Sequence, residues 1–346
     1  MSKEKKATPT TETAKESCGK SKKNLLDESI ILSKQELNSV PRNAGFFSIR
    51  SANETIQEAA TRPDPDNLWR KMWYEGEICC LFSDSNKGKS ILAVQIGEEI
   101  SLKQKVLYFD FELSDKQFQL RYTGEHGELH HFPDLFFRVE IDREKLSRDN
   151  FQDEIIFNIE QTIVTTKSKV VIIDNITWLH SAVEKGEIAG ELMIQLSKLK
   201  FKHELSMLVV AHTPKRSLTN PITQNDLGGS KKLFNFFDSC FAIGESAKDP
   251  NLRYIKQLKV RYGTFTHNAD HVLVGYIEKA TDCTRFEFYD ETATERDHLK
   301  AISESDRNSL RIRAIELKES GLSVRDIGTM LGVGKSTISN WTKSDK

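Results

Sequence analysis

Residues 83–90 have the composition and the position of a phosphate-binding loop. They read Ser83, Asp84, Ser85, Asn86, Lys87, Gly88, Lys89 and Ser90, and they follow the apolar run 78–82. In such a loop, backbone N–H groups and the N-terminus of the next helix surround the phosphates, while the lysine meets their charge. The serine hydroxyl is a ligand for Mg²⁺. The spacing therefore predicts a site for a nucleotide polyphosphate and Mg²⁺, with Ser90 as a metal ligand.

One position departs from the usual pattern G-x-x-x-x-G-K-[ST], because Ser83 stands where that pattern begins with glycine. Glycine would permit a positive φ there, whereas serine adopts one only with strain. The next residues support the motif, since Ile91, Leu92, Val94 and Ile96 are apolar at helical spacing. The alternative is an ordinary strand, turn and helix with a surface lysine.

Two acidic residues at strand ends could complete a site for ATP hydrolysis. Asp174 closes the apolar run 170–173, as in a Walker B strand whose acid lies beside the metal. Glu112 follows the run 106–111, a strand that we expect beside the phosphate-loop strand. Ligands of α/β sheets bind at the carboxyl ends of the strands, so Glu112 is the candidate base for water. Its alternative role is an acid in the first turn of a helix, favoured by the helix dipole.

Apolar runs alternate with helical patterns between residues 75 and 290. We expect strands at 78–82, 106–111, 135–141, 170–173, 207–211, 239–243, 254–260, 271–276 and 285–289, and helices at 89–102, 115–123, 150–166 and 187–202. This alternation predicts an α/β fold with a mainly parallel sheet between helices, and the late strands predict antiparallel additions at one edge.

The C-terminal residues predict a separate, all-α helix-turn-helix domain. Leu310, Ile312, Ala314, Ile315 and Leu317 share one helical face, and Gly321 ends that helix. Ser323 caps a second helix at 324–331, and a third helix at 335–343 turns Ile338 and Trp341 inward. Two short helices around a glycine-containing turn have the helix-turn-helix layout.

The C-terminal unit is also locally basic. Residues 309–346 carry seven Lys or Arg against four acids, a net charge of +3, whereas the whole chain has a formal charge of −1. We expect Arg325 to contact phosphate and the third helix to face the major groove of DNA with Lys335, Ser336, Thr337, Ser339 and Asn340. The alternative is a unit for oligomerisation or protein docking.

Composition sets the remaining expectations. Residues 1–24, with seven Lys against three Glu, predict a disordered basic tail. Trp69 and Trp73 should pack against the core or a neighbouring subunit. No apolar stretch approaches the ~18 residues of a membrane span, there is no signal-peptide pattern, and the cysteines lack metal-ligand spacing, so we expect a cytoplasmic protein with reduced thiols. The expected organisation is tail 1–24, irregular lead-in 25–75, ATPase domain 76–290, linker 291–306 and helix-turn-helix domain 307–346.

Taken in order, the phosphate loop, Glu112 in Phe-Glu-Leu-Ser, Asp174, and a strand running into His212-Thr213-Pro214-Lys215 resemble the RecA-like P-loop ATPases. Among these, residues 60–290 look closest to the RepA-type hexameric helicases, near the DnaB helicases, which include ATPases of mobile elements. The C-terminal unit resembles the small helix-turn-helix domains of resolvases and transposases.

The resemblance implies roles for further residues. His212 would sense the γ-phosphate, and the Gly-rich stretch 225–231 would follow a DNA-binding loop. Lys259 and Arg261 match a Lys-x-Arg-x-Gly stretch that reaches the ATP site of the adjacent subunit, and strand alternation would place both on one face. The alternatives are a strand-end histidine with ordinary partners and a charged strand edge.

Two functions remain open from the sequence. The first is an oligomeric ATPase, in the resemblance a hexameric ring, that moves along or remodels DNA during replication or mobilisation of a mobile element. The second is a non-translocating, ATP-dependent regulator of transcription, plasmid maintenance or recombination. Strand displacement on a forked duplex separates them.

Overall fold

The computed structural model describes residues 42–145, 151–176, 188–213, 216–227, 231–301, 304–331 and 333–343. The predicted basic tail, Pro214, Lys215 and the glycines of the stretch 225–231 lie outside the described residues. The chain divides into two units, Met1–Asp64 and Pro65–Lys346.

The described part of the first unit is small. Strands β1 (Asn43–Ala44) and β2 (Phe47–Ser48) pair antiparallel and lead into helix α2 (Ala52–Ala59). Ser51 starts this helix with a capping box, in which its hydroxyl accepts the Glu54 N–H and Glu54 accepts the Ser51 N–H. The capping box satisfies two backbone donors that the first helical turn leaves free.

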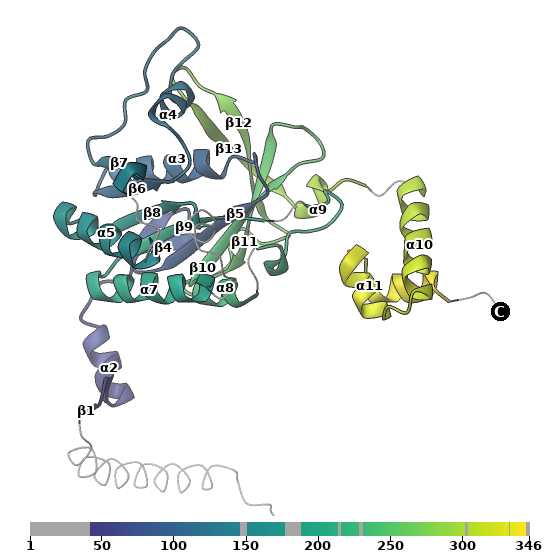
Figure 1. The fold of residues 1–346 in the computed structure, drawn as a ribbon, viewed down its shortest axis with the longest axis horizontal. Helices are drawn as coiled ribbons and strands as arrows, with labels where there is room; N and C mark the ends of the chain where they lie inside the picture. Colours follow the sequence, from purple (N-terminus) through teal and green to yellow (C-terminus); the bar gives the residue numbers. More distant parts are fainter. Residues whose placement is uncertain are drawn as a thin grey trace, which may run out of the picture. The chain divides into compact units, whose positions relative to one another are not determined.

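A nine-stranded sheet organises the second unit (Figure 1). Its strands are β5 (Ile78–Ser83), β6 (Val106–Asp110), β7 (Phe136–Glu140), β8 (Val170–Asp174), β9 (Ser206–His212), β10 (Ser239–Glu245), β11 (Leu252–Lys259), β12 (Val272–Lys279) and β13 (Thr284–Ala293). The order is β13-β12-β11-β10-β5-β9-β8-β6-β7. Pairing is parallel from β10 to β7 and antiparallel from β10 to β13.

The sheet confirms the predicted α/β fold class, a core of mainly parallel strands with antiparallel strands at one edge. Every strand and helix predicted between residues 75 and 290 is present. The predicted place of β6 was wrong, because β9 lies beside β5, and β6 pairs with β7 and β8. Strand order depends on packing between distant segments, which an apolar run does not encode.

Helices cover both faces of the sheet (Figure 1). One face packs against helix α3 (Lys89–Ser101) and the hairpin of β3 (Asn67–Trp69) and β4 (Trp73–Tyr74). The other face packs against α5 (Phe151–Thr166), α7 (Ile188–His203) and α8 (Lys231–Phe236). Trp69 and Trp73 are buried in the first layer, and Trp69 stacks on Phe241 at 5.4 Å, so their predicted packing against the core is confirmed.

The predicted linker 291–306 begins within the sheet unit. Strand β13 runs to Ala293, and helix α9 (Glu295–His298) follows it. Glu295 is buried, accepts the Ile222 N–H at 2.6 Å and forms an ion pair with Lys256. The prediction of a linker at these positions was wrong. It relied on their polar composition, but Glu295 and His298 are buried, where other residues of the domain form hydrogen bonds with them.

Three helices form the C-terminal part: α10 (Glu304–Glu319), α11 (Val324–Leu331) and α12 (Lys335–Trp341). Ala314, Ile327 and Ile338 make its buried core. Ile312 was predicted to share the inward face but is exposed. Gly328 permits the close approach of α11 to the following turn, because a Cβ there would lie 2.9 Å from the Val333 carbonyl oxygen.

Among the described helices, none has the length and apolar content needed to cross a membrane.

Candidate nucleotide site

The loop between β5 and α3 takes its shape from Asn86 and Gly88. Both have positive φ, 60° and 92° respectively. Ser83 instead ends strand β5, where it pairs with His212. The serine that replaces the first glycine of the motif therefore lies in a strand, where glycine is not required. Gly88 is required by space as well, since a Cβ there would lie 2.6 Å from the Ile277 Cδ1.

Lys89 is buried at the start of α3. Its Nζ donates to the carbonyl oxygens of Ser83 at 3.0 Å and Asp84 at 2.8 Å. Burial lowers the pKa of Lys89 to about 8, opposed by the carboxylates of Asp174, Glu112 and Asp84. The loop thus holds an ammonium whose desolvation makes an anionic ligand favourable.

Ser90 and Asp174 lie side by side beneath the loop. Asp174, at the end of β8, is buried and accepts the Tyr108 hydroxyl at 2.6 Å. Burial raises the pKa of Asp174, and its hydrogen bonds with Ser90 and Tyr108 lower it. A hydroxyl and a carboxylate oxygen in contact fit Mg²⁺, which takes oxygen ligands.

Glu112, Asn175 and His212 meet where β6, β8 and β9 end. The Asn175 amide donates to Glu112 Oε1 and lies 2.9 Å from His212 Nε2. His212 Nε2 is 3.5 Å from the same Glu112 oxygen. The contact with His212 is the main cause that holds the pKa of Glu112 below its usual value. Glu112 is therefore ionised at neutral pH and can accept a proton.

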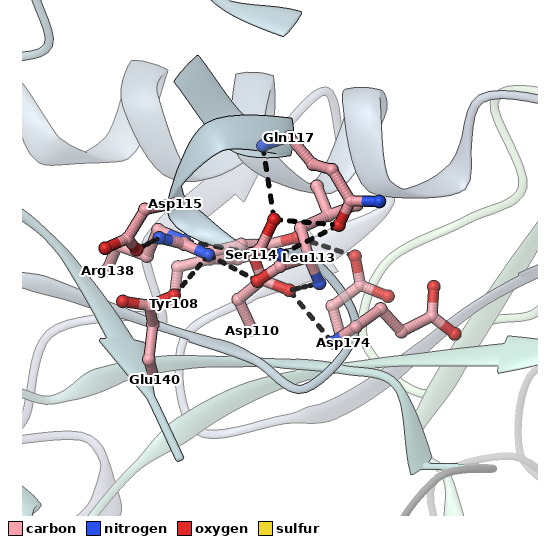
Figure 2. A network of polar contacts seen from close by, with 10 residues as sticks. Tyr108, Asp110, Leu113, Ser114, Asp115, Gln117, Arg138, Glu140 and Asp174 are labelled. Atoms are coloured by element: carbon pink, nitrogen blue, oxygen red, sulfur yellow. Dashed lines mark hydrogen bonds and ion pairs between the residues drawn. The ribbon is translucent and has the colours of Figure 1, made fainter. Parts of the chain in front are cut away.

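Asp110 and Arg138 bind each other and the backbone of Leu113 (Figure 2), and Asp110 also binds the backbone of Glu112. Asp110 Oδ1 accepts the N–H groups of Glu112 at 3.1 Å and Leu113 at 3.0 Å. Its other oxygen accepts Arg138 Nε at 3.0 Å, and Arg138 also contacts the carboxylates of Asp115 and Glu140. Sequence reasoning missed this pair, although Asp110 lies two residues before Glu112.

The phosphate loop, Glu112 and His212 border one cleft of about 660 Å³. Of the predicted residues, Ser85, Asn86, Gly88, Lys89, Ser90, Glu112 and His212 line it. Lys87 turns to Glu245 in β10, with which it forms an ion pair. Residues that sequence reasoning missed also line the cleft, namely Ile91, Arg121, Asn251, Arg253 and Ile277. The last three lie on or beside the antiparallel strands, whose position depends on sheet order.

Lys259 and Arg261 lie far from this cleft. Arg261 Nη1 contacts Asp238 at 2.6 Å, and Asp238 accepts the N–H of Ile78, the first residue of β5. The phosphate loop follows the last residue of β5, and the five steps of about 3.3 Å between its six residues separate the two ends by about 17 Å. Arg261 therefore cannot serve the cleft of its own chain.

Lys259 has partners different from those of Arg261. Its Nζ donates to the carbonyl oxygens of Phe234 at 3.2 Å and Asn235 at 3.4 Å. Strand β11 ends at Lys259, so the alternation that was predicted to align the two cations stops before Arg261.

The predicted DNA-facing residues lie on α11 and α12. Arg325, Lys335, Ser336 and Asn340 are exposed, whereas Thr337 and Ser339 are half-buried beside the core residue Ile338. Ser323 caps α11, as predicted, by accepting the Asp326 N–H at 3.2 Å.

Comparisons with known proteins cover both parts of the chain. Residues 49–217 match the family described as AAA domain, and residues 305–344 match the family described as homeodomain-like domain. No curated protein matches the chain. A solved KaiC-like protein from the hyperthermophilic archaeon Pyrococcus horikoshii OT3 is similar at 11% identity and a TM-score of 0.47, over 62% of this chain and 91% of that chain. The chain thus has a longer segment similar to AAA domains and a C-terminal three-helix segment similar to homeodomain-like domains.

Proposed function

We propose that this protein hydrolyses ATP and acts on DNA as an oligomeric RepA-like helicase or remodeller, in the replication or mobilisation of a mobile element. One observation carries the ATPase part of the proposal. Lys89, Ser90, Glu112 and His212 line a single cleft, with the buried Asp174 in contact with Ser90.

Each residue has a distinct part in hydrolysis. The loop N–H groups and Lys89 bind the phosphates, and Ser90 and Asp174 would hold Mg²⁺, which neutralises charge on the phosphates. Glu112 accepts the proton of the attacking water, and the hydrogen bond from Asn175 orients the Glu112 carboxylate. His212 contacts the same carboxylate, so a change at the γ-phosphate can reach strand β9.

The position of Arg261 supports the oligomer. An exposed arginine at the opposite end of β5 from the phosphate loop can complete an ATP site only in another copy of the chain. Arginines supplied in this way typically raise turnover by about 10³–10⁵-fold. A single copy would hydrolyse ATP slowly.

The test combines ATP turnover with strand displacement. We expect turnover to rise when single-stranded or duplex DNA is added, and a forked duplex to be unwound only with hydrolysable ATP. The Lys89→Ala variant is the control for contaminating ATPases. Absence of ATP turnover by the full chain under all these conditions would contradict the proposal.

A second function follows from the helix-turn-helix. Base reading by α12 suits a protein that stays at one site, which favours an ATP-dependent regulator without translocation. This regulator would bind a specific duplex more tightly with ATP and leave the forked duplex paired.

A further inference from the structure

A cluster of metal-binding side chains lies outside the nucleotide cleft. His130 belongs to the loop after α4 (Asp115–Arg121), and Asp282 and Cys283 belong to the turn between β12 and β13. One ligand atom from each of the three residues lies within 4.8 Å of the others. The two segments are in close contact, since a Cβ on Gly124 would be 2.0 Å from the Thr281 carbonyl oxygen.

Both ring nitrogens of His130 have polar partners, and the ring packs against an aromatic side chain. Its Nδ1 lies 2.9 Å from Asp282 Oδ2, and its Nε2 lies 2.9 Å from Glu98 Oε1 on α3. The ring packs edge-on against Phe132 at 4.5 Å, and the side chain is only 7% exposed. Histidines that bind metals usually give their second ring nitrogen to a carboxylate, which is the position of Glu98 here.

Cys283 supplies a thiol at the same place. It is free and 2% exposed. Burial raises the pKa of Cys283 to about 11, with Asp282 adding to the effect. A cation at this position would favour the thiolate and would compensate the negative charge of Asp282.

We propose that His130, Asp282 and Cys283 bind one Zn²⁺ ion, with Glu98 orienting the histidine. Nitrogen, oxygen and sulfur ligands together suit Zn²⁺ better than Mg²⁺ or Ca²⁺, which take oxygen ligands. The ligand edges of a tetrahedral zinc site are about 3.4 Å, so the turn at 280–283 would move inward slightly on binding.

Such an ion would join two walls of the nucleotide cleft. Arg121 precedes the loop that carries His130, and Ile277 lies on β12, which leads into the turn. With three protein ligands and a water molecule in the fourth position, zinc would stabilise the cleft without taking part in hydrolysis. The inference does not depend on the proposed function.

Co²⁺ titration of the full chain tests the site. After treatment with a chelator, the protein is titrated with Co²⁺ in excess Mg²⁺ and without nucleotide, and absorption from the thiolate–cobalt bond is followed. We expect one equivalent of Co²⁺ to bind, and Zn²⁺ to displace it. The band should vanish in Cys283→Ser, and affinity should fall more than tenfold in His130→Ala.

Matched variants make the result decisive. Cys79→Ser, at another buried thiol, should bind Co²⁺ like the parent, and Glu98→Gln should bind it about 10–100-fold more weakly. Melting temperatures without metal identify any variant that fails to fold, in which case Asp282→Asn replaces it. Absence of the band, or unchanged binding by Cys283→Ser and His130→Ala, would overturn the proposal and leave His130 as a hydrogen-bonded bridge between Glu98 and Asp282.

Discussion

A carboxylate can take a proton from water only if it is ionised and held in place, and Glu112 meets both conditions through its neighbours. His212 lowers its pKa, Asn175 binds its oxygen, and Asp110 binds its backbone N–H. Glu112 was predicted because it ends an apolar strand, and His212 was predicted from the resemblance to RecA-like ATPases. The sequence did not predict Asn175 or Arg138, because their roles depend on which strands are neighbours.

The pKa of Lys89 predicts how ATP binding depends on pH. Phosphate binds the protonated ammonium, and in the free protein this proton is lost as the pH rises through about 8. Below that pH the charge is present and affinity is full; above it, the dissociation constant should rise by up to about tenfold per pH unit. Binding of a fluorescent ATP analogue between about pH 6 and 10 measures this.

Lys89→Arg is the matched control, because a guanidinium keeps its charge across this range. Its affinity, whatever the absolute value, should be independent of pH. A parent protein with constant affinity up to pH ~10 would show that Lys89 does not meet the phosphates as an ammonium.

Asp110 and Asp115 both contact Arg138, yet only Asp110 also binds the backbone of Glu112. Asp110→Ala should therefore lower kcat by up to about 100-fold through misplacement of the base, with little change in KM for ATP. Asp115→Ala, at a side chain that is 84% exposed, should leave kcat within about twofold. An equal decrease of kcat in the two variants would contradict the proposed positioning role of Asp110.

Among the elements, the strands and their mainly parallel arrangement were predictable, whereas the order of the strands in the sheet was not. Apolar runs located all the strands of the sheet, since each run is local. The place of β6, the hairpin of β3 and β4, and helix α9 depend on contacts between distant segments. Glu295 is the clearest example. This acidic residue is buried because it forms an ion pair with Lys256 and accepts a hydrogen bond from the Ile222 N–H, and both partners are distant in sequence.

The role of α9 gives a prediction about where the ATPase domain ends. A chain ending at residue 301 should fold and hydrolyse ATP. A chain ending at residue 290 loses Glu295 and leaves Lys256 buried without its ion pair, which typically costs about 3–5 kcal/mol. Urea unfolding of the two truncated proteins measures the difference in their free energies of unfolding. Equal values would mean that α9 does not stabilise the ATPase domain and belongs to the linker.

The same truncation at residue 301 tests the DNA-reading role of α12. At one fixed salt concentration, the truncated protein should lose its preference for a cognate duplex while ATP turnover persists. Unchanged preference would make the C-terminal unit a docking module.

At the scale of the whole molecule, the sheet separates the phosphate loop and Arg261 to opposite ends of β5. With the role proposed for Arg261, this separation predicts that activity requires more than one copy. Arg261→Ala should retain ATP binding but lose turnover. Mixing it with Lys89→Ala should restore part of the turnover, because some interfaces then combine the intact Lys89 of one variant with the intact Arg261 of the other. Failure of every mixing ratio to restore activity, with both variants folded, would contradict action in trans.

In the proposed function, the cleft bordered by Lys89 and Glu112 hydrolyses ATP, and the Glu112→Gln variant separates this reaction from nucleotide binding. The amide cannot take the proton of water, whereas the loop that binds the phosphates is unchanged. Nucleotide binding and turnover are measured on the same preparation of the parent and variant. We expect a dissociation constant within a few-fold of the parent and turnover lower by about 10²–10⁴-fold. Turnover equal to that of the parent would contradict the proposed function.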